Sequence, residues 1–75
     1  MSEPTFIAQC SDPAIFHDVR ARDAWVKRRV EQSNTDKGCM FARVSYWEAL
    51  ELVLVEAWPA PPEVQGDPRW QLVQA

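Results

Sequence analysis

The sequence predicts a small α+β domain in the order β-α-β-β-β, with an antiparallel-rich sheet and one long helix packed on one of its faces. Two observations predict this class. A helix-start signal followed by an apolar stripe of helical period occupies the first half of the chain, and segments rich in β-branched and aromatic residues occupy most of the second half. A chain of 75 residues is long enough for one domain, residues 1–75, and too short for two.

The first strand is predicted at residues 5–10, which are partly β-branched or aromatic and are bounded by Pro4 and by turn-forming residues. A helix follows directly. Ser11 or Asp12 can cap its first N–H groups, and Pro13 fits the first helical position because its missing N–H is not needed there. We expect one long amphipathic helix from Asp12 to about residue 33.

The apolar stripe of this helix lies within about 100° on a helical wheel, as a core-facing surface requires. Its members are Ile15, Phe16, Val19, Val26 and Val30. Turn-forming residues at 33–38 are expected to end the helix, with Asn34 or Gly38 able to take the left-handed conformation.

Two further strands are predicted at residues 39–47 and 50–58. The second of these is apolar on both parities, which is typical of a central strand covered on two faces. Ser45 and Glu48 also form a capping-box pattern that could open a second helix, but the run Val53-Leu54-Val55 favours a strand. We interpret the acidic residues at 48, 51 and 56 as polar interruptions that protect a sheet edge.

A loop is predicted at residues 59–68, which hold four of the six prolines, and a last short strand at residues 69–73. Residues 59–62 have the PxxP spacing of polyproline ligands, yet no arginine lies close by, so a rigid connector is the better interpretation.

Charge is distributed unevenly. The net charge is −3, but residues 20–29 hold five basic side chains against Asp23 alone, a local charge of +4 that leaves −7 for the rest. Residues 45–67 hold five acidic side chains and no basic one. The negative net charge argues against general attraction to nucleic acid or to an anionic membrane. The acidic segment 45–67 is a complementary surface for the basic helix, within the molecule or across a dimer.

The basic segment, with Trp25 in its midst, superficially suggests a nucleic-acid surface. The basic side chains split to both sides of the apolar stripe on a helical wheel, with Arg22 and Arg29 beside Trp25 and with Arg20 and Lys27 opposite. The i, i+4 spacing also favours two ion pairs along the helix, Asp18–Arg22 and Asp23–Lys27. We therefore expect a solvated, salt-bridged face whose long side chains cover Trp25, with a nucleic-acid-binding regulator as the alternative function.

No catalytic or metal-binding motif occurs in the sequence. Cys10 precedes the helix, where the helix dipole favours a thiolate, but His17, the single histidine, falls on the polar side of the wheel and is badly placed to act as its base. Cys10 and Cys39 lack metal-ligand spacing. We expect two free thiols, no metal, no cofactor and no enzymatic activity; a thiol-dependent or small-molecule enzyme is the second alternative.

The sequence begins without a signal-peptide pattern and has no apolar run approaching the roughly 18 to 20 residues that cross a bilayer, so we expect a soluble, cytoplasmic protein. One helix covers only one face of the sheet, whereas residues 39–58 are apolar on both faces. A homodimer that buries the open face is therefore predicted, with Trp47 or Trp58 among its anchors and another protein as a further partner. Trp25, Arg22 and Arg29 of the helix are the other expected interaction residues.

Overall fold

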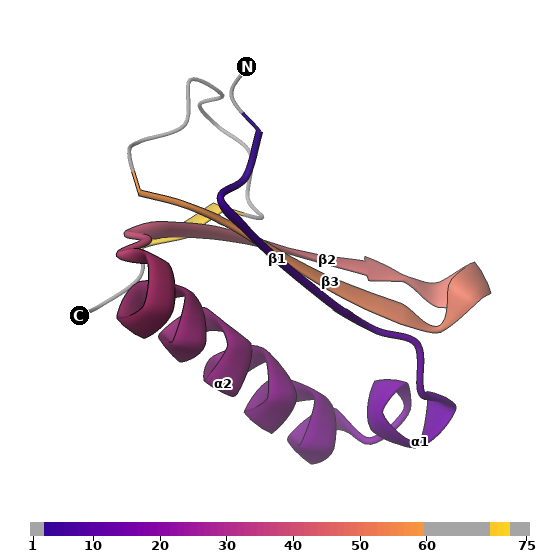
Figure 1. Ribbon diagram of the computed structural model, residues 1–75. Helices are drawn as coiled ribbons and strands as arrows, with labels where there is room; N and C mark the ends of the chain where they lie inside the picture. Colours follow the sequence, from indigo (N-terminus) through magenta and orange to yellow (C-terminus); the bar gives the residue numbers. More distant parts are fainter. Residues whose placement is uncertain (1–2, 60–69, 73–75) are drawn as a thin grey trace.

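The computed structural model describes residues 3–59 and the backbone of residues 70–72. Four strands form one antiparallel sheet in the order β1-β3-β2-β4, and two helices lie on one of its faces (Figure 1). The elements are β1 (Phe6–Cys10), α1 (Pro13–Phe16), α2 (Val19–Lys37), β2 (Phe41–Trp47), the 3₁₀ helix η1 (Glu48–Leu50), β3 (Leu52–Trp58) and β4 (Trp70–Leu72). The predicted α+β class and the order of its elements are confirmed. The predicted loop at residues 59–68 lies outside the described residues except for Pro59.

The core lies between the sheet and the helices. Val53 and Val55 of the central strand β3 are fully buried and cluster with Val44 and Phe16. The α2 side chains that pack against this cluster are Trp25, Val26 and Val30. A second cluster of small buried residues consists of Cys39, Ala42 and Ala57. The predicted strand at residues 50–58 is confirmed as β3, which begins at Leu52, and the parity that faces the helices, Val53, Val55 and Ala57, is fully buried.

The predicted single helix is in fact two helices that meet at His17 and Asp18. Asp12 caps α1 as expected, since its Oδ1 accepts a hydrogen bond from the Ala14 N–H at 2.9 Å. Asp18 has an extended backbone, and its side chain accepts hydrogen bonds from the first N–H groups of α2. An aspartate offers the backbone this competing bond, which apolar periodicity does not reveal. The assignment of Val19 to the core stripe was wrong for the same reason: it begins α2 and is 58% exposed.

The helix also ends later than predicted, at Lys37 instead of residue 33. Ser33 stays helical because its side chain is buried against the core and its hydroxyl donates to the Val30 carbonyl at 2.7 Å. Gly38 takes the left-handed conformation at φ 65°, and its N–H donates to the Asn34 carbonyl. Of the two residues proposed for this position, glycine adopts it because a Cβ atom would be strained there.

The connection between β2 and β3 is a tight turn. The capping-box pattern at Ser45 and Glu48 produces only the single 3₁₀ turn η1, and Ser45 itself lies buried in β2. Glu51 closes the turn at φ 50°, and it is the one non-glycine residue with positive φ in the described part of the chain.

Within residues 3–59 and 70–72, no helix is long and apolar enough to cross a membrane.

Candidate functional site

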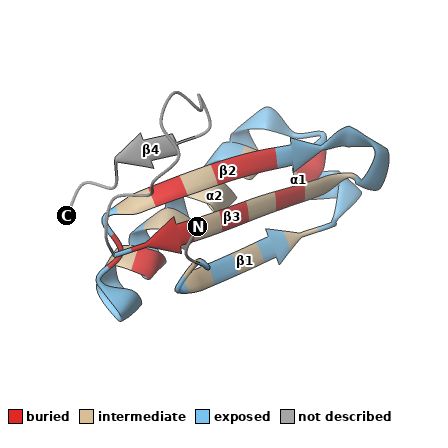
Figure 2. Cartoon of the chain, turned by 90° about the horizontal axis from the view of Figure 1, so that it is seen from above, coloured by how far each residue is buried: buried red, intermediate tan, exposed pale blue. Residues whose placement is uncertain are grey.

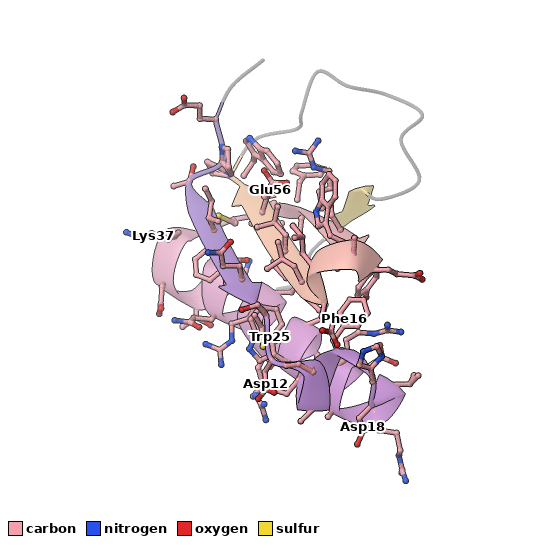
Figure 3. All side chains as sticks on the ribbon, turned by 90° about the vertical axis from the view of Figure 1, so that its right-hand side faces the viewer. Asp12, Phe16, Asp18, Trp25, Lys37 and Glu56 are labelled. Atoms are coloured by element: carbon pink, nitrogen blue, oxygen red, sulfur yellow. The ribbon has the colours of Figure 1, made fainter. Side chains whose placement is uncertain are left out.

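The face of the sheet opposite the helices is not covered by any helix of the described residues (Figures 1 and 2). Side chains of a strand alternate between the two faces, so the neighbours of the core residues point away from α2. In β3 these residues are Leu52, Leu54, Glu56 and Trp58. Figure 2 looks onto this face, and Figure 3 shows Glu56 on the opposite side of the sheet from Phe16 and Trp25. We call it the open face.

One part of the open face is closed by its own side chains. Arg43 and Glu56 are direct cross-strand partners, and the Arg43 Nε and Nη2 atoms donate to Glu56 Oε1 at 3.0 and 2.9 Å. Both side chains are about one-sixth exposed, at 16% and 15%. The guanidinium also lies 5.4 Å from the centre of the Trp58 ring, and Trp58 is buried. Glu56 therefore belongs to a central strand and to an ion pair, and the expectation that it protects a sheet edge was wrong.

The remaining part of the open face is apolar and accessible. Leu52 lies opposite Trp47, Leu54 follows two positions along the same strand, and Ile7 on β1 is the diagonal neighbour of Leu54. Ile7 is 61% exposed and Trp47 is 51% exposed. We call these four residues, Ile7, Leu54, Leu52 and Trp47, the open stripe. It crosses three strands and contains no charge.

The predicted interaction residues separate into two groups. Trp47 lies in the open stripe, whereas Trp58 is buried and has little surface to offer a partner. Trp25, Arg22 and Arg29 belong to α2 and lie on the other side of the sheet. Of the open stripe, only Trp47 was predicted. Ile7, Leu52 and Leu54 alternate with core residues along their strands, so the strand assignment already placed them on the face away from the helix.

Two arginines of α2, Arg22 and Arg29, cover aromatic rings. The Arg22 guanidinium lies 4.7 Å from the Tyr46 ring centre and 5.8 Å from that of Phe16, and Arg29 lies 5.7 Å from that of Trp25. The Nε atoms of both arginines are buried without a hydrogen-bond partner. The expected cover of Trp25 by a long side chain is confirmed.

The two predicted ion pairs along α2 do not form within the described residues. Asp18 caps the helix, and the Arg22 Nη1 donates to the Phe16 carbonyl at 3.5 Å. The exposed charged side chains of α2 that remain are of both signs: Arg20, Asp23, Lys27, Arg28, Glu31, Asp36 and Lys37. Positive charge is therefore not gathered into a groove on this helix.

An open groove of about 400 Å³ lies where α1 meets α2. Its lining consists of Phe16, His17, Val19, Arg22 and Glu48. His17 Nε2 contacts Glu51 Oε2 at 2.6 Å, and both side chains are well exposed, so this pair orients the imidazole without withdrawing it from water. The groove thus contains a base and a carboxylate, but no hydroxyl or thiol nucleophile is among its lining residues.

The two thiols are separate from this groove and from each other. Cys10 is half-buried at the end of β1, and Cys39 is fully buried in the core. Burial raises the pKa of the Cys39 thiol. His17 has Glu51 as its partner instead of Cys10. In residues 3–59 and 70–72, no group of three His, Cys, Asp or Glu side chains is arranged to hold a metal ion.

Comparison with known protein families, with curated proteins and with solved structures gives no match to this chain.

Proposed function

We propose that this protein is a non-enzymatic binding and assembly module that pairs with a second copy of itself through the open stripe. The observation that supports the proposal is the exposure of large apolar side chains on a sheet face that the helices do not cover. Contiguous exposed apolar surface rimmed by polar residues is typical of an interaction site. A second copy is the occupant because two-fold homodimers are the commonest assemblies of small chains.

The composition of the open stripe suits a symmetric interface. Its four residues are large and uncharged, and they can form the dry centre that a stable interface needs. Gln9 and Ser45 flank Leu54 on the neighbouring strands, so like charges do not meet at that position when two copies face each other. The Arg43–Glu56 pair is neutral as a unit and lies beside the stripe as part of a polar rim.

The proposal is tested by the mass of the protein in solution. We expect light scattering at about 50 μM to give twice the 8.6 kDa of the chain, since a stable dimer has a dissociation constant well below that concentration. Leu54→Lys is expected to weaken the dimer by about 100-fold or more, because a symmetric interface would bury two unpaired ammonium groups. Circular dichroism should show that the variant stays folded, since Leu54 lies outside the core.

Val19→Lys is the matched control. Val19 is 58% exposed, close to the values for Ile7 and Trp47 of the stripe, but it lies at the start of α2, on the helix side of the sheet. It should leave the dimer unchanged. A wild-type protein that is monomeric at this concentration, or equal effects of the two lysine variants, would refute the proposal.

A cytoplasmic location is part of the same proposal and is supported by the two free cysteines, since a reducing compartment keeps thiols unpaired. The nucleic-acid alternative is less well supported by the geometry, because Arg22 and Arg29 already stack on aromatic rings of the protein itself.

A further inference from the structure

The free edge of β1 is the second surface that lacks a cover. Among the strands that the structure describes, β1 is the first in the sheet order and pairs only with β3. Figures 1 and 2 show no described element beside its other edge. An edge strand presents unpaired N–H and C=O groups along that side, which is the arrangement that accepts another strand.

β1 lacks the features with which proteins usually protect such an edge. Its sequence Phe-Ile-Ala-Gln-Cys has no charged residue, no proline and no glycine. Ile7 and Gln9 are exposed, so large side chains at this edge stand in water. The edge at the opposite end of the sheet, β4, has only three residues. Short or charged edge strands resist pairing, and β1 is neither.

We propose that β1 pairs antiparallel with β1 of a second copy, in the register that centres on Ala8. This register pairs all five residues of the strand, with Phe6 opposite Cys10 and Ile7 opposite Gln9 of the partner. Because the strand is uncharged, no like charges lie opposite one another within it. On the helix side, the partially exposed Phe6 gains a neighbour in Cys10 of the second copy.

The same register joins the two open stripes. Ile7 lies at the β1 end of the stripe, and its symmetry mate becomes a diagonal neighbour across the new strand pair. The apolar band then continues from β2 of one copy to β2 of the other, across six strands of an eight-stranded sheet made from two four-stranded ones. This continuity argues for a second copy over an unrelated extended peptide, which would have to supply its own apolar residue beside Ile7.

The edge contact goes beyond the proposed face contact and is compatible with it. The edge partner lies in the plane of the sheet, whereas the face partner lies above that plane, so one molecule can make both contacts. Five residue pairs bury less than the roughly 1,200 Å² of a standard interface, so the edge contact alone is weak. A face dimer carries two β1 edges, and pairing both of them with the edges of a second face dimer strengthens the edge contact by avidity. A chain that makes both contacts therefore belongs to a tetramer with perpendicular two-fold axes.

Disulfide trapping of Ala8→Cys tests this register directly. In the proposed pairing the two copies of residue 8 lie opposite each other, within the Cα separation of about 4.5–5.5 Å that a cross-strand disulfide requires. The variant is made with Cys10→Ser, which removes the neighbouring thiol, and oxidised glutathione is the oxidant. We expect a disulfide-linked dimer at least about tenfold faster than with the control Thr5→Cys, whose symmetry mates are about 20 Å apart in this register.

A charge on the edge should prevent trapping. Gln9→Lys in the Ala8→Cys protein places an ammonium group opposite Ile7 of the partner and is expected to slow cross-linking by about tenfold or more. Gln32→Lys, the same change on the exposed side of α2, should leave the rate unaltered. Far-UV circular dichroism of each variant is the control that its fold is kept.

Repeating the trapping in Leu54→Lys separates this proposal from the proposed function. Cross-linking that persists in that background, with a normal preference for residue 8, supports the edge contact whether or not the face contact exists. Equal rates for Ala8→Cys and Thr5→Cys, or equal effects of Gln9→Lys and Gln32→Lys, would overturn the edge proposal and leave the face dimer to its own test.

Discussion

The Arg43–Glu56 pair offers the sharpest test of how the open face is held together. The Arg43 guanidinium makes two hydrogen bonds to one oxygen of Glu56, and both side chains are mostly buried on the central strands. Removing one member of a fully buried pair costs about 3–5 kcal/mol because it leaves a charge without its partner. Since about one-sixth of each side chain reaches water, we expect about 2 kcal/mol for Glu56→Gln and a similar loss for Arg43→Met.

These losses are large for a chain of this size. A domain of 75 residues has a free energy of unfolding of about 4–11 kcal/mol. Urea unfolding followed by circular dichroism, with all proteins at the same concentration, should therefore show lower midpoints while the variants remain folded in water. The constant concentration matters because any assembly also adds to the apparent stability.

The double variant decides whether the two residues act as a pair. Arg43→Met combined with Glu56→Gln should cost about 2–3 kcal/mol instead of the sum of the single losses, since either single change already removes the ion pair between the two side chains. The reasoning would be refuted if the losses add to within about 0.5 kcal/mol, or if Glu56→Gln alone is neutral.

Three further predictions concern single positions. Gly38→Ala should lower the stability by about 1 kcal/mol in urea unfolding, because φ is positive there while no atom lies within 4 Å of an added Cβ atom. Glu51→Gly should be about 1 kcal/mol more stable than Glu51→Ala, since both lose the His17 contact but only glycine relieves the positive φ. Burial raises the pKa of Cys39, so the folded state favours its neutral thiol. The resulting stability is fully present below pH 9.0 and is lost as the pH rises further, and the urea midpoint of the wild type should fall more between about pH 8 and about pH 10 than that of Cys39→Ala.

The candidate surfaces were only partly predictable. The sequence indicated that one helix cannot cover both faces of an apolar sheet, and this is why an open face was expected. It could not separate Trp47 from Trp58, since both are tryptophans of strands that point toward the open face. Both tryptophans end their strands, but Trp58 has the Arg43 guanidinium over its ring and is buried, whereas Trp47 borders the turn η1 and is 51% exposed. The free edge of β1 was not anticipated either, because strand order is a long-range property.

The sequence by itself determined the elements of this protein and most of their limits. Local chemistry is sufficient there: Asp12 and Pro13 begin a helix, Gly38 ends one, and the apolar run Val53-Leu54-Val55 forms a strand. Tertiary structure decided the rest. Burial of Ser33 against the core carries α2 past its turn-forming residues, and the place of β3 between β1 and β2 decides which apolar residues are covered. These outcomes depend on contacts between residues far apart in the chain, which local sequence patterns do not show.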